Sequence, residues 1–395
     1  MTRPITSLGV SRHLQIFEPT HEAALRRLSA VDPDRYARSR NALDGAVTGL
    51  SPYFTHGRLS LPDAARAIHA RQPLRFEDKL VFELGWREFF HPVWQHAPDG
   101  GDGILRDMQG SLPWPGTYAN AVPDNIREGR TGVPAIDSAV RTPYATGYLH
   151  NHARMWLASY VVHLRTVHWR AGADWLCGHL LDGDLPSNHL SWQWVAATFS
   201  GKPYLFNADN VLRYAPAAAQ AAWASPNTVI DTSYEALEEL ARRQRGTDPE
   251  RVAHAGVTEP GLTGTLPGHT EATSAAPEGY LKALAQVLYG PAAIKNIANT
   301  TGRPLELIHP WALSPRMAGV TDAVWAGDLT TLDLSGSTQV TAQATLFPGY
   351  RQTLAAVAKL TPAPRLLLSP AMACRSFSKF YGRVRHGDGE FADLL

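Results

Sequence analysis

Helical periodicity dominates residues 20–240 of this 395-residue chain, and no other feature constrains the fold as strongly. Apolar residues recur there at helical spacing, whereas the alternation typical of strands is scarce. The pattern is carried by THEAALRRLSAV, PDAARAIHARQ, FEDKLVFELGWREFFHPVWQH, PAIDSAVRT and HNHARMWLASYVVHLRTVHW. Segments rich in Pro, Gly and Asn separate them, as in LPWPGTYANAVPDN. The sequence therefore predicts a mainly α fold whose helices are joined by irregular loops.

A change of composition marks a second part of the chain. Residues 246–279 are rich in Gly, Pro, Thr and Ala and have no periodicity, which favours a linker. Beyond it, PLELIHPWAL, DAVWAGDL and PRLLLSP are candidate strands and GYRQTLAAVAKL is a candidate helix. We expect a helical domain over residues 1–245 and a small α/β domain over 280–395. The terminal segment RSFSKFYGRVRH is interpreted as a solvated helix or tail.

Bulk properties narrow the environment and the chemistry. The formal net charge is +1, so attraction to nucleic acid would need a local patch. The N-terminus has no apolar signal region and the chain has no long apolar run, so we expect a cytoplasmic protein without a membrane span. Two cysteines, Cys177 and Cys374, cannot supply four metal ligands, and H-E-x-x-H is absent. We therefore expect reduced thiols and no metal.

Tryptophan is concentrated in the helical part. Eight of the eleven lie between residues 86 and 194: Trp86, Trp94, Trp114, Trp156, Trp169, Trp175, Trp192 and Trp194. Core packing explains any single one, because an indole buries a large area. As a group they suggest more, since planar rings can stack on a flavin or an extruded base, and closely spaced indoles can pass electrons.

The charge distribution is uneven in the same region. No Asp or Glu occurs from residue 138 to 173, which predicts a basic face formed by Arg141, Arg154, Arg165, Arg170, His150, His152, His163 and His168. A solvated helix surface is the alternative. The acidic, Trp-rich stretch LLDGDLPSNHLSWQW follows directly, which favours a contact with phosphate or DNA.

Several motifs together resemble a known family. TGLSPYFTHGRLS, ELGWREFF, RTGVPAIDSAVR, TGYLHNHARM, HWRAGADW and LLDGDLPSNHLSWQW occur in the order of the helical FAD-binding domain of the cryptochrome/photolyase family. The resemblance runs from about residue 36 to residue 214. It implies an all-helical photolyase-type domain that binds FAD, followed here by the small α/β domain.

The resemblance also implies site residues, by position in the matched motifs. FAD phosphates and the ribityl chain would be held by Tyr36, Thr48, Leu50 and Ser51. The flavin would be lined by Arg87, Asn151, Arg154, Asp182, Asp184 and Asn188, with Asp182 pairing with Arg154 and Asn188 facing N5. An amide suits that place because it can accept a hydrogen bond from N5–H or donate one to N5. Electron transfer to the flavin would run through Trp192 and Trp169.

A substrate set is implied in the same way. Glu83, Trp86, Met155 and Trp194 match positions that receive a flipped pyrimidine dimer, and His152 matches a contact to the DNA backbone. A dimer inside a duplex must be extruded before an enzyme can reach it, and damage lowers the cost of extrusion. We therefore expect light-dependent repair of cyclobutane dimers, in single- or double-stranded DNA, by a carbon–carbon lyase. The alternatives are a cryptochrome-like photoreceptor that signals through a protein partner, and a DNA-binding or structural module without flavin.

Three departures limit the resemblance. The family's N-terminal antenna domain is missing, so we expect no antenna chromophore. The third tryptophan of the electron relay falls at Gly116, and Trp114 is the candidate that replaces it. His152 stands where an arginine is usual, which weakens a phosphate contact unless the imidazole is protonated.

Overall fold

The computed structural model describes residues 17, 21–55, 59–97, 118–242, 305–307, 340–344, 346, 355, 359–367, 376–387 and 389–395. Helices predominate among these residues, and each of the five helical segments predicted above contains a helix. The predicted linker, 246–279, lies outside the described residues, as does most of the predicted α/β domain. The mainly α fold class is thus confirmed, while the domain boundaries stay a prediction.

The first group of helices is called here the N-terminal lobe. It comprises α1 (His21–Ser29), α2 (Pro33–Ser39), α3 (Ser51–Thr55), α4 (Leu61–His69) and α5 (Lys79–Gln95). Local chemistry fixes several starts. Asp32 accepts a hydrogen bond from Arg35 N at the start of α2, and Ser60 accepts one from Asp63 N before α4. Such side-chain caps satisfy N–H groups that have no partner within the helix.

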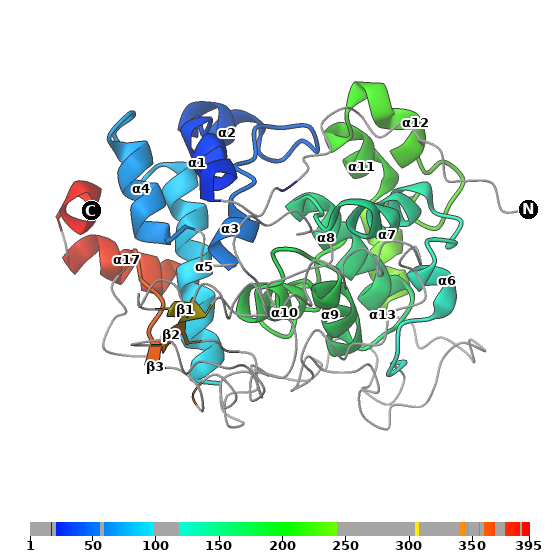
Figure 1. Cartoon of the computed structure of the whole chain (residues 1–395). Coiled ribbons are helices and arrows are strands. Elements are labelled where there is room, and N and C mark those ends of the chain that lie inside the picture. Colours follow the sequence, from blue (N-terminus) through cyan, green and yellow to red (C-terminus); the bar gives the residue numbers. More distant parts are fainter. Residues whose placement is uncertain are drawn as a thin grey trace, which may run out of the picture.

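The second group is called here the central lobe. It comprises α6 (Asp124–Arg127), α7 (Pro134–Thr146), α8 (Asn151–Ser159), the π-helix η2 (Tyr160–Leu164), α9 (Trp169–Gly178), α10 (Leu185–Val195), α11 (Ala208–Tyr214), η3 (Ala217–Ala219), α12 (Gln220–Trp223) and α13 (Tyr234–Arg242). Figure 1 shows the two lobes side by side, with α9 and α10 between them. The sequence predicted a helix across residues 150–169, where the structure has α8 followed by η2.

Helix α10 connects the two hydrophobic cores. Leu185 and Leu190 pack into the core of the N-terminal lobe, whereas Trp192 and Val195 pack into the core of the central lobe. Most of its side chains are buried, and these include the polar residues Asn188, His189 and Gln193. Most of the segment LLDGDLPSNHLSWQW is therefore buried between the two cores, while Trp194 near its end is exposed.

The end of the chain packs onto the N-terminal lobe. Helix α17 (Phe377–Gly387) lies beside α5 (Figure 1), and Phe377, Phe380 and Tyr381 are buried in the core of that lobe. Arg365 donates a hydrogen bond to the Glu88 carboxylate at 3.1 Å. A 3-10 helix, η8 (Phe391–Leu394), follows and also contributes a buried side chain. The interpretation of this segment as a solvated helix or tail is wrong, because its aromatic residues share one helix face that α5 covers.

Three short strands form a parallel sheet in the order β1, β2, β3. They are β1 (Leu305–Leu307), β2 (Val340–Gln343) and β3 (Lys359–Thr361). The candidate strand PLELIHPWAL contains β1, but Leu366 and Leu367 of PRLLLSP are not in a strand. Those two leucines are buried in the helical core instead. The candidate helix GYRQTLAAVAKL ends in β3, so its last residues were predicted wrongly.

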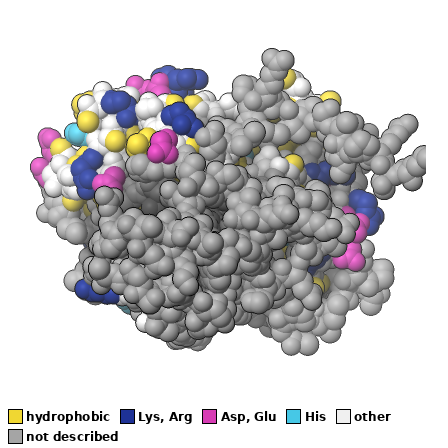
Figure 2. Space-filling model, viewed as in Figure 1, with side chains coloured by type: hydrophobic (Ala, Val, Ile, Leu, Met, Phe, Trp, Pro, Cys, Tyr) yellow, Lys and Arg dark blue, Asp and Glu magenta, His cyan; other side chains and the backbone are white. Residues whose placement is uncertain are grey.

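Half of the predicted basic face lies inside the protein. His150, His163 and His168 are buried, and Arg154 is paired with an acid inside the protein. His150 and His168 accept hydrogen bonds from backbone N–H groups at the starts of α8 and α9. Figure 2 shows Lys and Arg interspersed with Asp and Glu over the region of α1, α2 and α4. A run of basic residues in sequence does not make a basic surface, because neutral histidine can be buried as a helix cap.

Candidate functional site

Helix α10 brings together most of the acids and amides that the sequence predicted for a cofactor. The helix packs against α5, α8 and α9. Asp182 and Asp184 precede it and Asn188 lies in its second turn, and all three are buried. Asp184 caps the helix by accepting a hydrogen bond from Ser187 N at 3.1 Å. The short loop with its cap therefore fixes both carboxylates at the junction of the lobes.

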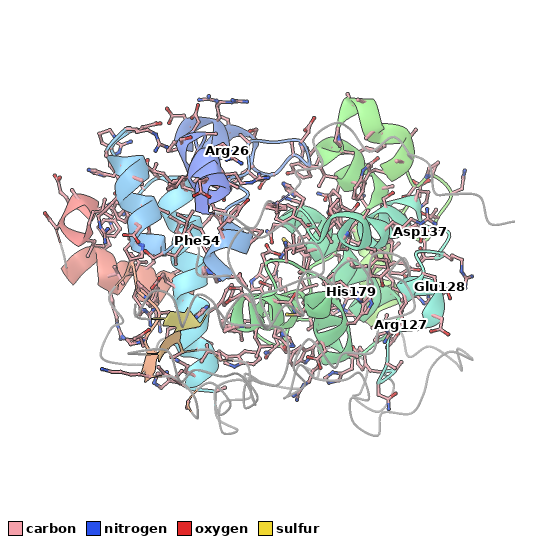
Figure 3. All side chains as sticks on the ribbon, in the orientation of Figure 1. Arg26, Phe54, Arg127, Glu128, Asp137 and His179 are labelled. Carbon is pink, nitrogen blue, oxygen red and sulfur yellow. The ribbon has the colours of Figure 1, made fainter. Side chains whose placement is uncertain are left out.

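Arg154, Asp182 and Ser51 form one connected group. Arg154 Nη2 donates to both oxygens of Asp182 at 2.8 Å, and Ser51 Oγ donates to Asp182 Oδ2 at 2.6 Å. Burial alone lowers the pKa of Arg154, but the charge and hydrogen bond of Asp182, together with Tyr148 and Cys177, outweigh it and raise that pKa. Each charge compensates the desolvation of the other. The predicted pair is thus formed, and it ties α8, α3 and the loop before α10 to one point; Phe54 marks α3 in Figure 3.

Asp184 is the centre of a second group. Arg87 Nη2 lies 3.3 Å from Asp184 Oδ1, and His91 Nε2 lies 3.1 Å from the same oxygen. Burial alone raises the pKa of Asp184, but Arg87, His91 and Ser187 outweigh it and hold that pKa well below its usual range. Arg87 also donates to Thr55 Oγ1 at 3.2 Å. Sequence reasoning missed His91, although its place one helical turn after Arg87 on α5 was a usable signal.

Asn188 presents one free polar atom. Its Nδ2 donates to Ala173 O at 2.9 Å and lies 3.3 Å from His189 Nδ1. Among the described residues, none donates a hydrogen bond to Asn188 Oδ1. An amide fixed in this way offers a carbonyl acceptor at the junction of the lobes.

The residues predicted for the phosphates and the flavin edge are less tightly connected. Thr48 Oγ1 accepts from Leu50 N at 3.3 Å in the turn before α3, and the Leu50 side chain is buried. Tyr36 is half-buried, and burial together with the nearby Glu83 raises its pKa. Asn151 is exposed at the start of α8, and its Nδ2 lies 3.8 Å from Met155 Sδ. These side chains surround the junction without forming a network of their own.

Trp192 on α10 and Trp169 on α9 are both buried. Gly172 explains how they fit: a Cβ on this residue would lie 2.3 Å from Trp192 Cζ3. The indole of Trp192 therefore rests on the α9 backbone, one helical turn after Trp169. Trp114, the candidate third station, lies outside the described residues.

The four residues predicted to face a dimer have separate partners. Glu83 lies 3.6 Å from Arg40, and burial raises the pKa of Glu83. Trp194 is 37% exposed, and its ring lies 5.8 Å from that of Tyr204. Met155 is half-buried beside Asn151. No hydrogen bond or ring contact in the described part of the chain joins these four side chains to one another.

Trp86 is occupied by the C-terminal helix. Its ring stacks on Phe377 of α17, with centroids 3.9 Å apart and planes 11° from parallel. Phe90 and Phe89 surround the same indole at 5.3 and 5.7 Å. One face of Trp86 therefore already carries an aromatic ring, in the arrangement that an extruded base would otherwise adopt.

His152, the predicted DNA contact, is held against aromatic rings. Its ring lies 4.5 Å from Tyr214 and 5.8 Å from Trp156. Burial, and then the Arg40 charge, lower its pKa below the ordinary histidine value. The imidazole is therefore neutral at neutral pH, which does not suit it to a contact with a phosphate charge.

Other chemistry has little support in the described residues. They contain no group of three or more His, Cys, Asp or Glu side chains that could hold a metal ion. No helix among them combines the length and the apolar character that a membrane crossing needs. A polar hollow lined by residues of α11 and α13 contains none of the predicted site residues.

The fold and the lobe junction indicate the class of domain. Buried Arg–Asp pairs, a hydroxyl and a free amide carbonyl meet between two helical lobes, as in an all-helical domain that encloses a charged, aromatic cofactor. The sequence model of the FAD binding domain of DNA photolyase matches residues 80–226. Residues 80–226 are thus similar to the FAD binding domain of DNA photolyase, and this similarity supports FAD as the cofactor.

The chain is also similar to individual proteins over part of its length. A deoxyribodipyrimidine photo-lyase of Thermus thermophilus is 38% identical over 186 residues, which are 46% of this chain and 44% of that protein. One from Synechococcus is 33% identical over 193 residues, 46% of this chain and 39% of that protein. A solved cryptochrome structure from Synechocystis is similar at 25% identity with a TM-score of 0.43, over 51% of this chain and 44% of that chain. The chain thus spans less than half the length of the curated relatives it matches.

Proposed function

We propose that this protein is a FAD-dependent, light-driven lyase that splits cyclobutane pyrimidine dimers in DNA. One observation carries the proposal: α10 gathers Asp182, Asp184 and Asn188 at the lobe junction, inside the segment that matches the photolyase FAD domain. The similarity to deoxyribodipyrimidine photo-lyases gives the reaction class. Bound, reduced and excited by light, FAD supplies the electron that opens the dimer.

The cofactor would be held by groups whose chemistry suits it. Ser51 and Thr48 offer hydroxyls near the turn before α3, and together with Tyr36 and the backbone of Leu50 they would hold the phosphates and the ribityl chain. Arg87, Arg154 and Asn151 would line the flavin. Two cationic side chains complement two phosphate charges, although both guanidiniums are already paired with acids. Their main task is therefore to hold Asp182 and Asp184 in place.

Asn188 would act at the flavin edge. Its Oδ1 is free to accept a hydrogen bond, while its Nδ2 is held by Ala173 O. An N–H at N5 would therefore meet an acceptor whose orientation the protein has already fixed. Trp192 and Trp169 would pass electrons toward the flavin from their places on α10 and α9.

The dimer would be bound by Glu83, Trp86, Met155 and Trp194. Glu83 is half-buried beside Arg40, and its carboxyl would form a hydrogen bond with a pyrimidine of the dimer. Trp194 is the most exposed of the set and could stack on an extruded base. Neutral His152 would add little to DNA affinity.

The test is illumination of the reduced protein with an oligonucleotide that contains one cyclobutane dimer. We expect dimers to disappear in light and to persist in the dark. Trp194→Ala should lower repair while the flavin absorbance stays, because Trp194 packs at the surface. A matched control is Tyr234→Ala, another exposed aromatic residue, 45% exposed on α13. A purified protein without flavin absorbance would contradict the proposal outright.

A second candidate function rests on the contact between Trp86 and Phe377. Helix α17 covers one face of Trp86 in the structure. This favours a blue-light photoreceptor that photoreduces FAD through its tryptophans and signals through a protein partner contacted by the C-terminal part. If dimers persist under light while FAD is still photoreduced, the photoreceptor function is supported and repair is not.

A further inference from the structure

A buried imidazole lies between two indoles from different helices. His189 on α10 makes an edge-to-face contact with Trp94 on α5, at a centroid distance of 5.4 Å and an interplanar angle of 76°. His189 makes a second edge-to-face contact with Trp169 on α9, at a centroid distance of 6.3 Å and an interplanar angle of 90°. Because the two contacts share one ring, the centroids of the two indoles are at most about 12 Å apart. All three side chains are nearly inaccessible to solvent.

Polar groups lie against both nitrogens of the bridging imidazole. His189 Nε2 lies 2.8 Å from Asp174 Oδ1, and Nδ1 lies 3.2 Å from Leu185 O and 3.3 Å from Asn188 Nδ2. Asp174 is itself buried on α9, and its second oxygen, Oδ2, has no hydrogen-bond partner in the described part of the chain. A buried carboxylate oxygen without a partner costs free energy. Such a group needs an explanation beyond packing.

A negative group beside aromatic rings stabilises positive charge on them. The interaction is strong in this place because the surroundings are apolar and screen little. Trp169 is also the second station of the proposed electron relay, and it must carry a positive charge after it has given up an electron. Neither Asp174 nor His189 belongs to the predicted cofactor or dimer groups, so both are available for this role.

We propose that Trp94 is the third station of the electron relay, coupled to Trp169 across His189, with Asp174 as the positioning residue. This rests on the proposed photoreduction of FAD through Trp192 and Trp169. One electron passes from Trp94 to oxidised Trp169, which is thereby reduced, and Trp94 is left oxidised with its indole proton in place. The primary oxidant is the light-excited oxidised flavin, and a thiol in solution returns the electron to Trp94.

The edge-to-face contacts supply a continuous path for this transfer. Electron transfer between aromatic rings weakens steeply with distance, and a ring in van der Waals contact with both partners shortens the gap. Trp94 lies at the last turn of α5, next to the exposed residues Gln95 and His96. The positive charge thus moves away from the lobe junction toward a part of the helix that reaches solvent.

The experiment is flash excitation of the FAD-loaded full-length protein, with the absorbance of oxidised tryptophan and of reduced flavin followed in time. We expect Trp94→Phe to shorten the life of the separated charges about tenfold, because oxidised Trp169 then recovers its electron from the flavin. Trp94→Tyr keeps an oxidisable ring and should restore most of the lifetime. Trp175→Phe is the matched control: this buried indole on α9 donates to Tyr144 and should leave the decay unchanged.

Asp174→Asn tests the positioning residue separately. It keeps an acceptor for His189 and removes the charge, so the lifetime should shorten while flavin absorbance and thermal stability stay close to those of the unmodified protein. A merely structural aspartate would alter stability and leave the decay unchanged.

The inference is overturned if Trp94→Phe decays like the unmodified protein while Trp114→Phe collapses the signal. Failure of the proposed function is visible in a different variant. If Trp192→Phe leaves flavin photoreduction unchanged, the proposed relay through Trp192 is absent. This result does not depend on the Trp94 variants.

Discussion

The cofactor side and the substrate side of the proposed site are built differently. On the cofactor side, Arg154, Asp182 and Ser51 are joined by hydrogen bonds of 2.6 to 2.8 Å, and Asp184 is tied to Arg87 and His91. On the substrate side, Glu83, Trp86, Met155 and Trp194 each contact a different neighbour outside the set. The first group is a network, and the second is four separate contacts.

The difference follows from what each side must do. Buried charges need partners in the folded protein whether or not a ligand is present, so the cofactor side is organised by the ion pairs themselves. Apolar and aromatic groups have no such requirement, and they pack against whatever covers them. The structure therefore supports FAD binding more strongly than it supports dimer binding.

The largest expected effect is on the ion pair of the cofactor side. Asp182→Asn leaves the Arg154 guanidinium buried without a counter-charge, which should cost about 3 to 5 kcal/mol of the free energy of unfolding. Flavin should also be lost on purification, as absorbance would show. Glu238→Gln is the matched control, because Glu238 pairs with Arg242 at 2.7 Å in an exposed position, where a pair contributes about 1 kcal/mol or less. Equal losses in both variants would contradict the network.

The next effect concerns the substrate side. Phe377→Ala removes a buried ring from Trp86 and Phe82 and should lower the free energy of unfolding by about 3 kcal/mol. Flavin content, measured by absorbance on protein kept below its melting temperature, should not change, since no charged group of the cofactor side touches this ring. Loss of flavin from the folded variant would show that the two sides are not separate. Leu25→Ala, at an exposed leucine, is the control for apolar truncation.

A smaller effect tests the packing of Trp192 against α9. Gly172→Ala puts a methyl group against the indole, which should cost about 1 to 3 kcal/mol and displace the ring. Thermal unfolding and tryptophan fluorescence would record the two consequences. Gly178→Ala on the same helix meets no atom within 4 Å and should be nearly neutral. A neutral Gly172→Ala would mean that Trp192 is not packed on the helix backbone.

The effect that is smallest per pH unit lies outside both sides and concerns a buried histidine. His163 is buried on η2 with Nε2 2.8 Å from Val195 O, and burial lowers its pKa to about 4. An unfolded histidine titrates near pH 6.5, so the unfolded state binds more protons between pH 6.5 and 4. The free energy of unfolding should therefore be highest above pH 6.5 and should fall by about 1 kcal/mol for each pH unit between pH 6.5 and 4.

Denaturant unfolding at several pH values would measure that slope. His163→Gln keeps a donor for Val195 O and removes the titration, so its slope should be shallower. His150 has a pKa lowered to about 4 by the same cause, and its contribution should remain in the variant. An unchanged slope in His163→Gln would mean that His163 is not the group that titrates.

The helices could be predicted from the sequence because apolar spacing is a local property. The segment that begins at Pro134 forms α7, and the segment 76–96 contains α5, as their apolar spacing predicted. The burial of His163 and His168, which removes them from the predicted basic face, could not be predicted. It depends on helices that come from other parts of the chain. PRLLLSP failed for a similar reason: its leucines are buried by helices and not in a sheet.

The sequence by itself determined the helical class, because apolar spacing is local, and its resemblance to the photolyase FAD domain implied the pairing of Arg154 with Asp182. Only the tertiary structure decided which side chains share a site. It placed His91 on Asp184, His189 between two indoles and Phe377 on Trp86, each from segments far apart in the chain. Short-range spacing fixes what a helix presents, whereas its neighbours are chosen by the burial of whole faces, a non-local balance of packing and desolvation.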